Sequence, residues 1–161
     1  MQQSHILIIE DDPSVCELLY SLMNNLGCRA TVAQFGEEGL SLIENDPPDL
    51  LLLDLELPGM NGLDVCRAMR RDPWMSKIPV LMLTGKAGED EMIAGLEVGA
   101  DDYVTKPFSA NLLAARVNAL LRRGRSIGEG LIERCAEDSI PHLVLKTLGR
   151  CELRFGTASF H

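Results

Sequence analysis

The chain has 161 residues, of which 46% are hydrophobic and 24% are charged, and its formal net charge is −9. This length and composition are ordinary for one soluble globular domain with a short extension. The acidic balance argues against a broad basic surface for nucleic acid, although DNA binding through a further segment is not excluded. No hydrophobic run reaches the roughly 18 residues that cross a bilayer, and the first residues do not resemble a secretion signal.

The cysteines are dispersed and form no CxxC pair. An odd, scattered set favours a reducing cytoplasm over a disulfide framework or a zinc site. We therefore expect core or incidental cysteines in a cytoplasmic protein without a membrane partner. The five positions are Cys16, Cys28, Cys66, Cys135 and Cys151.

Short β-rich segments alternate with segments of helical periodicity along most of the chain. The expected strands cover residues 5–10, 28–33, 50–54, 78–83 and 102–105. The expected helices cover residues 15–26, 36–44, 62–71 and 89–98, and a last helix begins after the capping residue Ser109. In the fourth helix, Met92, Ile93 and Leu96 are expected to face inward. This alternation predicts an α/β domain whose five-stranded parallel sheet has helices on both faces and right-handed crossovers.

Residues 50–62, LLLLDLELPGMNG, contain the feature that most needs explaining. Four leucines without polar alternation predict a central strand that is buried on both faces. Asp54 places a carboxylate at the end of this strand, and Pro58 and Gly59 predict a turn soon after it. Ligands of open parallel sheets bind outside the carboxyl ends of the strands. The sequence therefore predicts a site around Asp54.

Several other strand ends also carry polar side chains. They are Glu10, Asp11 and Asp12 after the first strand, Thr84 after the fourth and Lys106 after the fifth. Carboxylates about 4 Å apart repel by roughly 4 kcal/mol at a dielectric of 20, so a cation between them is expected, and oxygen ligands suit Mg²⁺ or Mn²⁺. A carboxylate beside such a cation and a lysine can attack phosphorus. Each residue alone has a simpler explanation, and Asp12 before Pro13 suits a helix N-cap.

Four segments together resemble the receiver domain of two-component response regulators, and they are most similar to the OmpR/PhoB subfamily. The segments are ILIIEDDP (6–13), PDLLLLDLELPGMNGLDVCR (48–67), IPVLMLTG (78–85) and GADDYVTKPF (99–108). They occur in the order and spacing of that family. The resemblance implies a flavodoxin-like, doubly wound receiver domain over residues 1–123.

The resemblance also implies a role for each matching residue. Asp54 corresponds to the phosphoacceptor, and Glu10, Asp11, Asp54 and the backbone carbonyl of Glu56 to the Mg²⁺ ligands. Asp12 lies one place beyond the acidic pair and stays outside the metal set. Thr84, Tyr103 and Lys106 correspond to the switch and phosphate-contacting residues. The implied protein is not an enzyme acting on a separate substrate. It takes a phosphoryl group from a sensor histidine kinase and shifts the face of its fourth helix, fifth strand and fifth helix.

In the OmpR/PhoB subfamily this face forms dimers through salt bridges between subunits. Asp102 and Arg116 fit that scheme, whereas Met92 and Leu112 stand where charged residues are usual. We expect a homodimer on this face that phosphorylation favours. The alternative is that these residues simply pack within one domain.

Residues 124–161 are expected to form a linker, GRSIGEG, and the start of a second domain. The segments HLVLKTLG and CELRFG read as short strands, which resemble the small sheet that opens a winged-helix effector domain. The chain is thus expected to be a fragment of a longer transcription regulator that binds DNA only through the missing part. A genuine short tail is the alternative.

Two other function classes fit parts of the pattern. A Mg²⁺-dependent phosphatase of the haloacid-dehalogenase type also has an aspartate at a strand end, but its nucleophile normally follows the first strand. A receiver-like module that binds partners without phosphorylation is the other alternative. A single phosphoryl adduct that disappears in Asp54→Asn is expected for the first interpretation, whereas sustained turnover of phosphate esters would support the phosphatase.

Overall fold

The computed structural model describes residues 3–85 and 89–137, with the side chains of the last helix described as far as Arg125. Residues 1–125 form one compact unit and residues 126–161 another. The two strands predicted in the tail lie outside the described residues. The segment 124–130, expected as a linker, continues as helix, because the last helix runs without interruption from Ala110 to Glu137.

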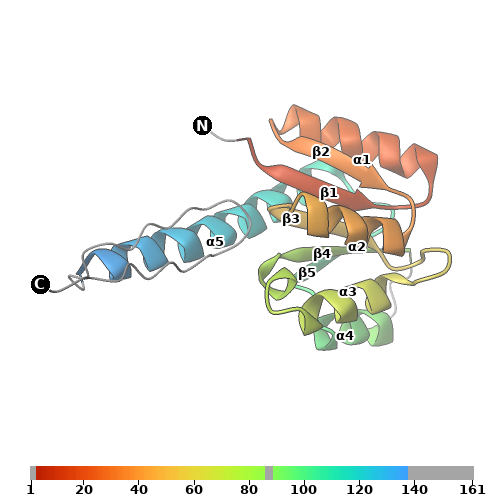
Figure 1. Ribbon diagram of the computed structural model, residues 1–161. Helices are drawn as coiled ribbons and strands as arrows, with labels where there is room; N and C mark the ends of the chain where they lie inside the picture. Colours follow the sequence, from red (N-terminus) through yellow and green to blue (C-terminus); the bar gives the residue numbers. More distant parts are fainter. Residues whose placement is uncertain (1–2, 86–88, 138–161) are drawn as a thin grey trace, which may run out of the picture. The chain divides into compact units, whose positions relative to one another are not determined.

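Five parallel strands form the sheet of the first unit (Figure 1). The strands are β1 (His5–Ile9), β2 (Arg29–Ala33), β3 (Leu50–Asp54), β4 (Val80–Thr84) and β5 (Asp102–Thr105). Their order is β2-β1-β3-β4-β5, and every neighbouring pair is parallel. This is the flavodoxin-like order, in which the chain turns to opposite sides of the sheet after β1 and β3. The predicted fold class is therefore confirmed.

The helices cover both faces of the sheet. They are α1 (Pro13–Asn25), α2 (Gly36–Asn45), α3 (Gly62–Arg71), α4 (Glu89–Glu97) and α5 (Ala110–Glu137), with a short 3-10 turn, η1 (Met75–Lys77), after α3. One core cluster joins the sheet to α1 and α5, and a second joins it to α2 and α3. Figure 1 shows α4 beside α3.

The four leucines of β3 belong to both clusters. Leu50 and Leu52 pack with α1 and α5, whereas Leu51 and Leu53 pack against the opposite helices. All four side chains are fully buried, which is worth about 2 kcal/mol for each. This burial holds Asp54, the next residue of β3, at a fixed position on the sheet edge.

The first loop ends in a helix cap. The Asp12 carboxylate accepts hydrogen bonds from the backbone N–H groups of Ser14 (2.8 Å) and Val15 (3.2 Å), and Pro13 occupies the first turn of α1. Such a cap stabilises a helix by about 1 kcal/mol. The capping role predicted for Asp12 is confirmed.

The orientation predicted for α4 is wrong for two of its three residues. Ile93 and Leu96 are 52% and 50% exposed, and only Met92 is partly covered. Gly95 is buried against the sheet, where an added Cβ would lie 3.0 Å from the sulfur of Met82. Because glycine has no side chain, α4 can approach β4 closely at this residue.

Strand β4 begins two residues later than predicted. Ile78 caps the end of η1 by donating its backbone N–H to the carbonyl of Met75, and Pro79 follows it. The strand therefore starts at Val80 and includes Thr84 as its last residue.

An arginine joins α3 to the start of β4 and to the turn between α4 and β5, and the sequence did not predict it. The Arg70 guanidinium donates to the carbonyls of Gly99 (2.8 Å), Ser76 (3.0 Å) and Ile78 (2.9 Å). It also pairs with Asp101 at 3.0 Å, and Asp101 accepts the N–H of Val80. Arg70 thus fixes the turn that leads into β5.

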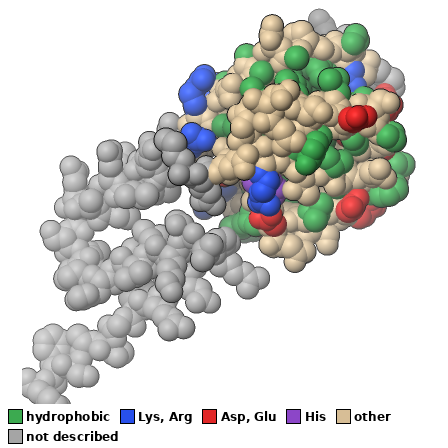
Figure 2. Space-filling view, turned by 90° about the horizontal axis from the view of Figure 1, so that it is seen from above, with side chains coloured by type: hydrophobic (Ala, Val, Ile, Leu, Met, Phe, Trp, Pro, Cys, Tyr) green, Lys and Arg blue, Asp and Glu red, His purple; other side chains and the backbone are tan. Residues whose placement is uncertain are grey.

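None of the helices among residues 3–85 and 89–137 is both long and apolar enough to cross a membrane. The face in Figure 2 carries scattered hydrophobic side chains with basic and acidic groups between them. The basic groups do not merge into a broad patch on that face.

Candidate functional site

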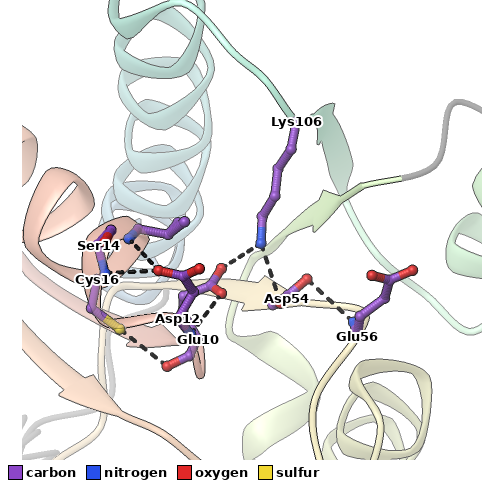
Figure 3. Close-up of polar contacts among 8 residues, drawn as sticks. Glu10, Asp12, Ser14, Cys16, Asp54, Glu56 and Lys106 are labelled. Carbon is purple, nitrogen blue, oxygen red and sulfur yellow. Dashed lines mark hydrogen bonds and ion pairs between the residues drawn. The ribbon is translucent and has the colours of Figure 1, made fainter.

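The carboxyl ends of the strands bring the predicted polar residues to one edge of the sheet. Glu10 directly follows β1, Asp54 ends the neighbouring strand β3, and Lys106 directly follows β5. The β1/β3 pair is where the strand order changes direction, which is the usual place for a ligand in this fold. Figure 3 shows the three side chains pointing toward one another.

Three carboxylates form an acidic cluster. Glu10, Asp11 and Asp54 each offer an oxygen atom, and these atoms lie within 4.8 Å of one another. Glu10 and Asp54 are 1% and 3% exposed, whereas Asp11 faces solvent. A set of oxygen donors with one open side suits Mg²⁺ or Mn²⁺. Asp12 does not join the cluster, because its carboxylate caps α1.

Lys106 supplies the only positive charge that the structure places against these carboxylates among the described residues. Its ammonium lies 2.6 Å from Oε2 of Glu10 and 3.2 Å from Oδ2 of Asp54. Burial disfavours the charged lysine, but the hydrogen bond to Glu10 and the charge of Asp54 outweigh it, so the pKa of Lys106 is raised. Burial also raises the pKa of Glu10; the Lys106 hydrogen bond opposes this, and the charge of Asp54 adds to it.

Backbone N–H groups hold the second oxygen of each buried carboxylate. Asp12 N–H donates to Oε1 of Glu10 at 3.2 Å, and Glu56 N–H donates to Oδ1 of Asp54 at 3.2 Å. In Figure 3 the Glu56 carboxylate lies on the far side of Asp54 from Glu10. The Glu56 side chain therefore does not belong to the acidic cluster, and its predicted contribution remains that of the backbone carbonyl.

After the loop that follows β3, Gly62 at the start of α3 packs against the backbone of Asp54. A Cβ atom at Gly62 would overlap the carbonyl oxygen of Asp54 and lie 2.9 Å from the Cα of Leu55. Gly59, at φ +77°, provides the turn that the sequence predicted. The start of α3 thus packs directly against the backbone of Asp54.

A buried cysteine supports the loop after β1. The Cys16 thiol donates to the carbonyl oxygen of Glu10, with 3.1 Å between sulfur and oxygen. Burial, with the charge of Glu10 in addition, raises the pKa of this thiol, so it stays protonated. Cys16 had been predicted only as a core or incidental cysteine. Its spacing of six residues from Glu10 gave no signal of this contact, because the contact depends on the packing of α1.

Thr84 and Tyr103 line a narrow cavity between α4 and the strands β4 and β5. The cavity has a volume of about 10 Å³ and is lined by Leu55, Met82, Thr84, Met92, Gly95, Leu96, Ala100 and Tyr103. Thr84 is buried and Tyr103 is partly buried against the second core cluster. The structure therefore places both predicted switch residues next to α4.

The predicted dimer residues lie on α4, β5 and α5 rather than in the acidic cluster. Arg116 pairs with Asp102 within one chain, at 2.6 Å. Leu112 is 45% exposed and Met92 lines the cavity under α4. Asp102 and Arg116 are thus partners of each other in a single chain, and the prediction that they contribute to a dimer face stays a prediction.

Comparison with known proteins identifies the same family as these residues do. A family model described as "Response regulator receiver domain" matches residues 6–118. The receiver domain of the Francisella response regulator 1452 is similar in structure, with a TM-score of 0.70 and 31% sequence identity. The match covers 75% of this chain and 98% of that one.

Two curated relatives come from Mycolicibacterium smegmatis. The DNA-binding response regulator MtrA is 47% identical over 121 residues, which are 75% of this chain and 52% of the relative. The sensory transduction protein RegX3 is 47% identical over 119 residues, which are 74% and 51% of the two chains. The chain spans about half the length of these curated relatives.

Proposed function

The chain belongs to the response regulator receiver domain family, and on that premise we propose that it accepts a phosphoryl group on Asp54 in a Mg²⁺-dependent reaction. The observation that carries the proposal is the position of Asp54. Its carboxylate stands at the sheet edge between two further carboxylates and the ammonium of Lys106. A nucleophile with such neighbours suits phosphoryl transfer, in which positioning and charge neutralisation provide most of the catalysis.

The acidic cluster fits a magnesium ion. Glu10, Asp11 and Asp54 would hold it through carboxylate oxygens, and the carbonyl of Glu56 would be a further ligand. When bound, the ion would neutralise negative charge on the phosphoryl oxygens and on the carboxylates around them.

The phosphoryl donor would be a phosphohistidine of a sensor histidine kinase. An oxygen of Asp54 attacks the phosphorus and forms an acyl phosphate, while the bond from phosphorus to the imidazole nitrogen breaks. The electron pair of that bond stays on the imidazole nitrogen, and this nitrogen takes up a proton from solvent, which leaves the kinase histidine as neutral imidazole. Lys106, already 3.2 Å from Asp54, would then contact a phosphoryl oxygen. The protein is thus a substrate and catalyst of its own modification.

The output would be a shift of the α4-β5-α5 face. A phosphoryl group on Asp54 would carry about −1.5 to −2 charge in place of the single negative charge of the carboxylate, and it would attract Lys106 and the hydroxyl of Thr84. Tyr103 would fill the space that Thr84 leaves beside the cavity under α4. Since α4 exposes large hydrophobic side chains, a shift of this helix changes a surface suited to a second copy of the chain.

We further propose that residues 1–123 are the receiver unit and that residues 124–161 lead into an effector domain. Curated relatives about twice the length of the matched region are called DNA-binding response regulators, which supports transcription regulation as the output of a full-length protein. DNA would be bound by that effector part alone.

The test is incubation of the full chain with Mg²⁺ and acetyl phosphate, followed by intact mass spectrometry. One phosphoryl adduct is expected in the wild type and in Asp64→Asn, a control at an exposed carboxylate that pairs with Arg67. No adduct is expected in Asp54→Asn or without Mg²⁺. An unmodified wild-type chain contradicts the proposal, and sustained turnover of phosphate esters would favour a phosphatase instead.

A further inference from the structure

A cavity lies at the edge of the sheet opposite the acidic cluster. Its volume is about 640 Å³, which is within the range of small-molecule sites. It is lined by Gln3, Ser4, Leu26, Gly27, Cys28, Asp49, Asn118, Leu121 and Arg125. Residues 3–4, 26–28 and 49 directly precede β1, β2 and β3, so they lie at the amino ends of three adjacent strands. The residues proposed for phosphoryl transfer, all of which the structure describes, do not line this cavity.

Part of the cavity lining is apolar. Cys28 and Leu121 are 5% and 8% exposed and belong to the core cluster that joins the sheet to α1 and α5. Leu26 packs against the same cluster. An apolar group that enters the cavity would therefore leave water and pack on the edge of the core, which favours its binding.

Opposite charges also line the cavity. The Arg125 guanidinium donates to the Ser4 hydroxyl at 2.9 Å, and the Asp49 carboxylate accepts the backbone N–H of His5 at 2.7 Å. Among the residues that the structure describes, no ion pair joins Arg125 to Asp49. Both charges nevertheless act on the Cys28 thiol: burial raises its pKa, the charge of Arg125 opposes this, and the charge of Asp49 adds to it. The cavity thus presents a cation and an anion that a bound molecule can bridge.

We propose that this cavity binds a small zwitterion of the amino-acid type with an apolar side chain. The carboxylate of the ligand would pair with Arg125, because a planar guanidinium can donate two parallel hydrogen bonds to a carboxylate. The ammonium would pair with Asp49, and the apolar side chain would pack on Leu26 and Leu121. A ligand with one charge satisfies one of the two cavity charges and binds more weakly. The inference does not depend on the proposed function, since it uses none of the residues around Asp54.

The test is titration of the ¹⁵N-labelled full chain with L-leucine, followed by ¹H–¹⁵N spectra. The amide signals of Gly27, Cys28 and Asn118 are expected to shift and to saturate with a Kd on the order of 1 mM. Two analogues keep the apolar body and lack one charge each: 4-methylpentanoate lacks the ammonium, and 3-methylbutylamine lacks the carboxylate. Each is expected to bind at least about tenfold more weakly, because a hydrogen bond to a charged group contributes about that factor.

Variants of the two charged residues assign the two ends of the ligand. Arg125→Met should weaken the binding of leucine and 4-methylpentanoate about tenfold and leave that of 3-methylbutylamine unchanged. Asp49→Asn should have the reverse effect on the two analogues. The matched control is Arg123→Met, at an exposed position of α5 that does not line the cavity. It should keep leucine binding within about twofold of the wild type, since an exposed charge outside the site is screened.

Three results overturn the inference. The first is equal binding of leucine and both analogues, and the second is leucine binding that Arg125→Met leaves unchanged, because either one shows that the charges are not recognised. The third is the absence of saturable shifts up to roughly 50 mM leucine. The proposed function stands or falls separately, through the phosphoryl adduct on Asp54.

Discussion

Replacing Arg70 by methionine should destabilise the domain far more than any ordinary change on a helix surface. The Arg70 side chain is only 19% exposed and donates to the carbonyls of Gly99, Ser76 and Ile78. Methionine keeps most of the apolar stem and removes every donor. The three carbonyls then lose a charged partner, and Asp101 loses its ion pair.

The magnitude follows from these contacts. A lost hydrogen bond costs about 1 kcal/mol, and up to about 3 kcal/mol where a buried acceptor stays unsatisfied. Water can reach part of this site, since Asp101 is 41% exposed, and its ion pair is therefore discounted. Three carbonyls at somewhat over 1 kcal/mol each give a loss of about 3 to 4 kcal/mol in the free energy of unfolding.

The same helix provides the matched control. Arg67 pairs with Asp64 at the surface, where both side chains are 48% exposed, so Arg67→Met should cost less than about 1 kcal/mol. Urea denaturation of both variants, followed through the single tryptophan, Trp74, measures the difference. If Arg70→Met unfolds within about 1 kcal/mol of Arg67→Met, the assigned role of Arg70 is wrong.

Three further outcomes are expected. Because burial raises the pKa of Glu10 above 4.5 and Mg²⁺ needs the ionised form, Mg²⁺ affinity measured by calorimetry should be constant at neutral pH and fall as the pH drops through that raised pKa; a constant affinity down to pH 4.5 would refute this. Gly62→Ala should cost about 2 kcal/mol or more in urea denaturation, because its Cβ would meet the backbone of Asp54; wild-type stability would show that the loop relaxes freely. Light scattering with a beryllofluoride mimic should detect a dimer that Leu112→Glu weakens and Leu18→Glu, on α1, does not; a monomer at high concentration in the wild type excludes the proposed dimer.

The sheet and the acidic cluster could be predicted from the sequence, because the order of strands and the polar residues at their ends determine both. Uniform leucines indicated a strand buried on two faces, and the carboxyl ends of parallel strands must meet at one edge. Glu10, Asp54 and Lys106 come together there as the spacing implied.

Other features depend on three-dimensional packing that periodicity does not contain. Ile93 and Leu96 match a helical stripe, yet both are half exposed, and Gly95 is the residue of α4 that lies close to Met82 of the sheet. The contacts of Arg70 join segments up to 31 residues apart, and a basic residue at a helix end gives no sign of them. The hydrogen bond from the Cys16 thiol to the carbonyl of Glu10 could not be predicted either, because it depends on how α1 packs.

The most direct test of the central claim is chemical trapping of the modified residue. After reaction with acetyl phosphate and Mg²⁺, borohydride reduces an aspartyl phosphate to homoserine, which peptide mapping locates in the sequence. The account predicts homoserine at position 54 alone. Homoserine at position 11, or phosphate on a hydroxyl residue with Asp54 intact, would contradict it.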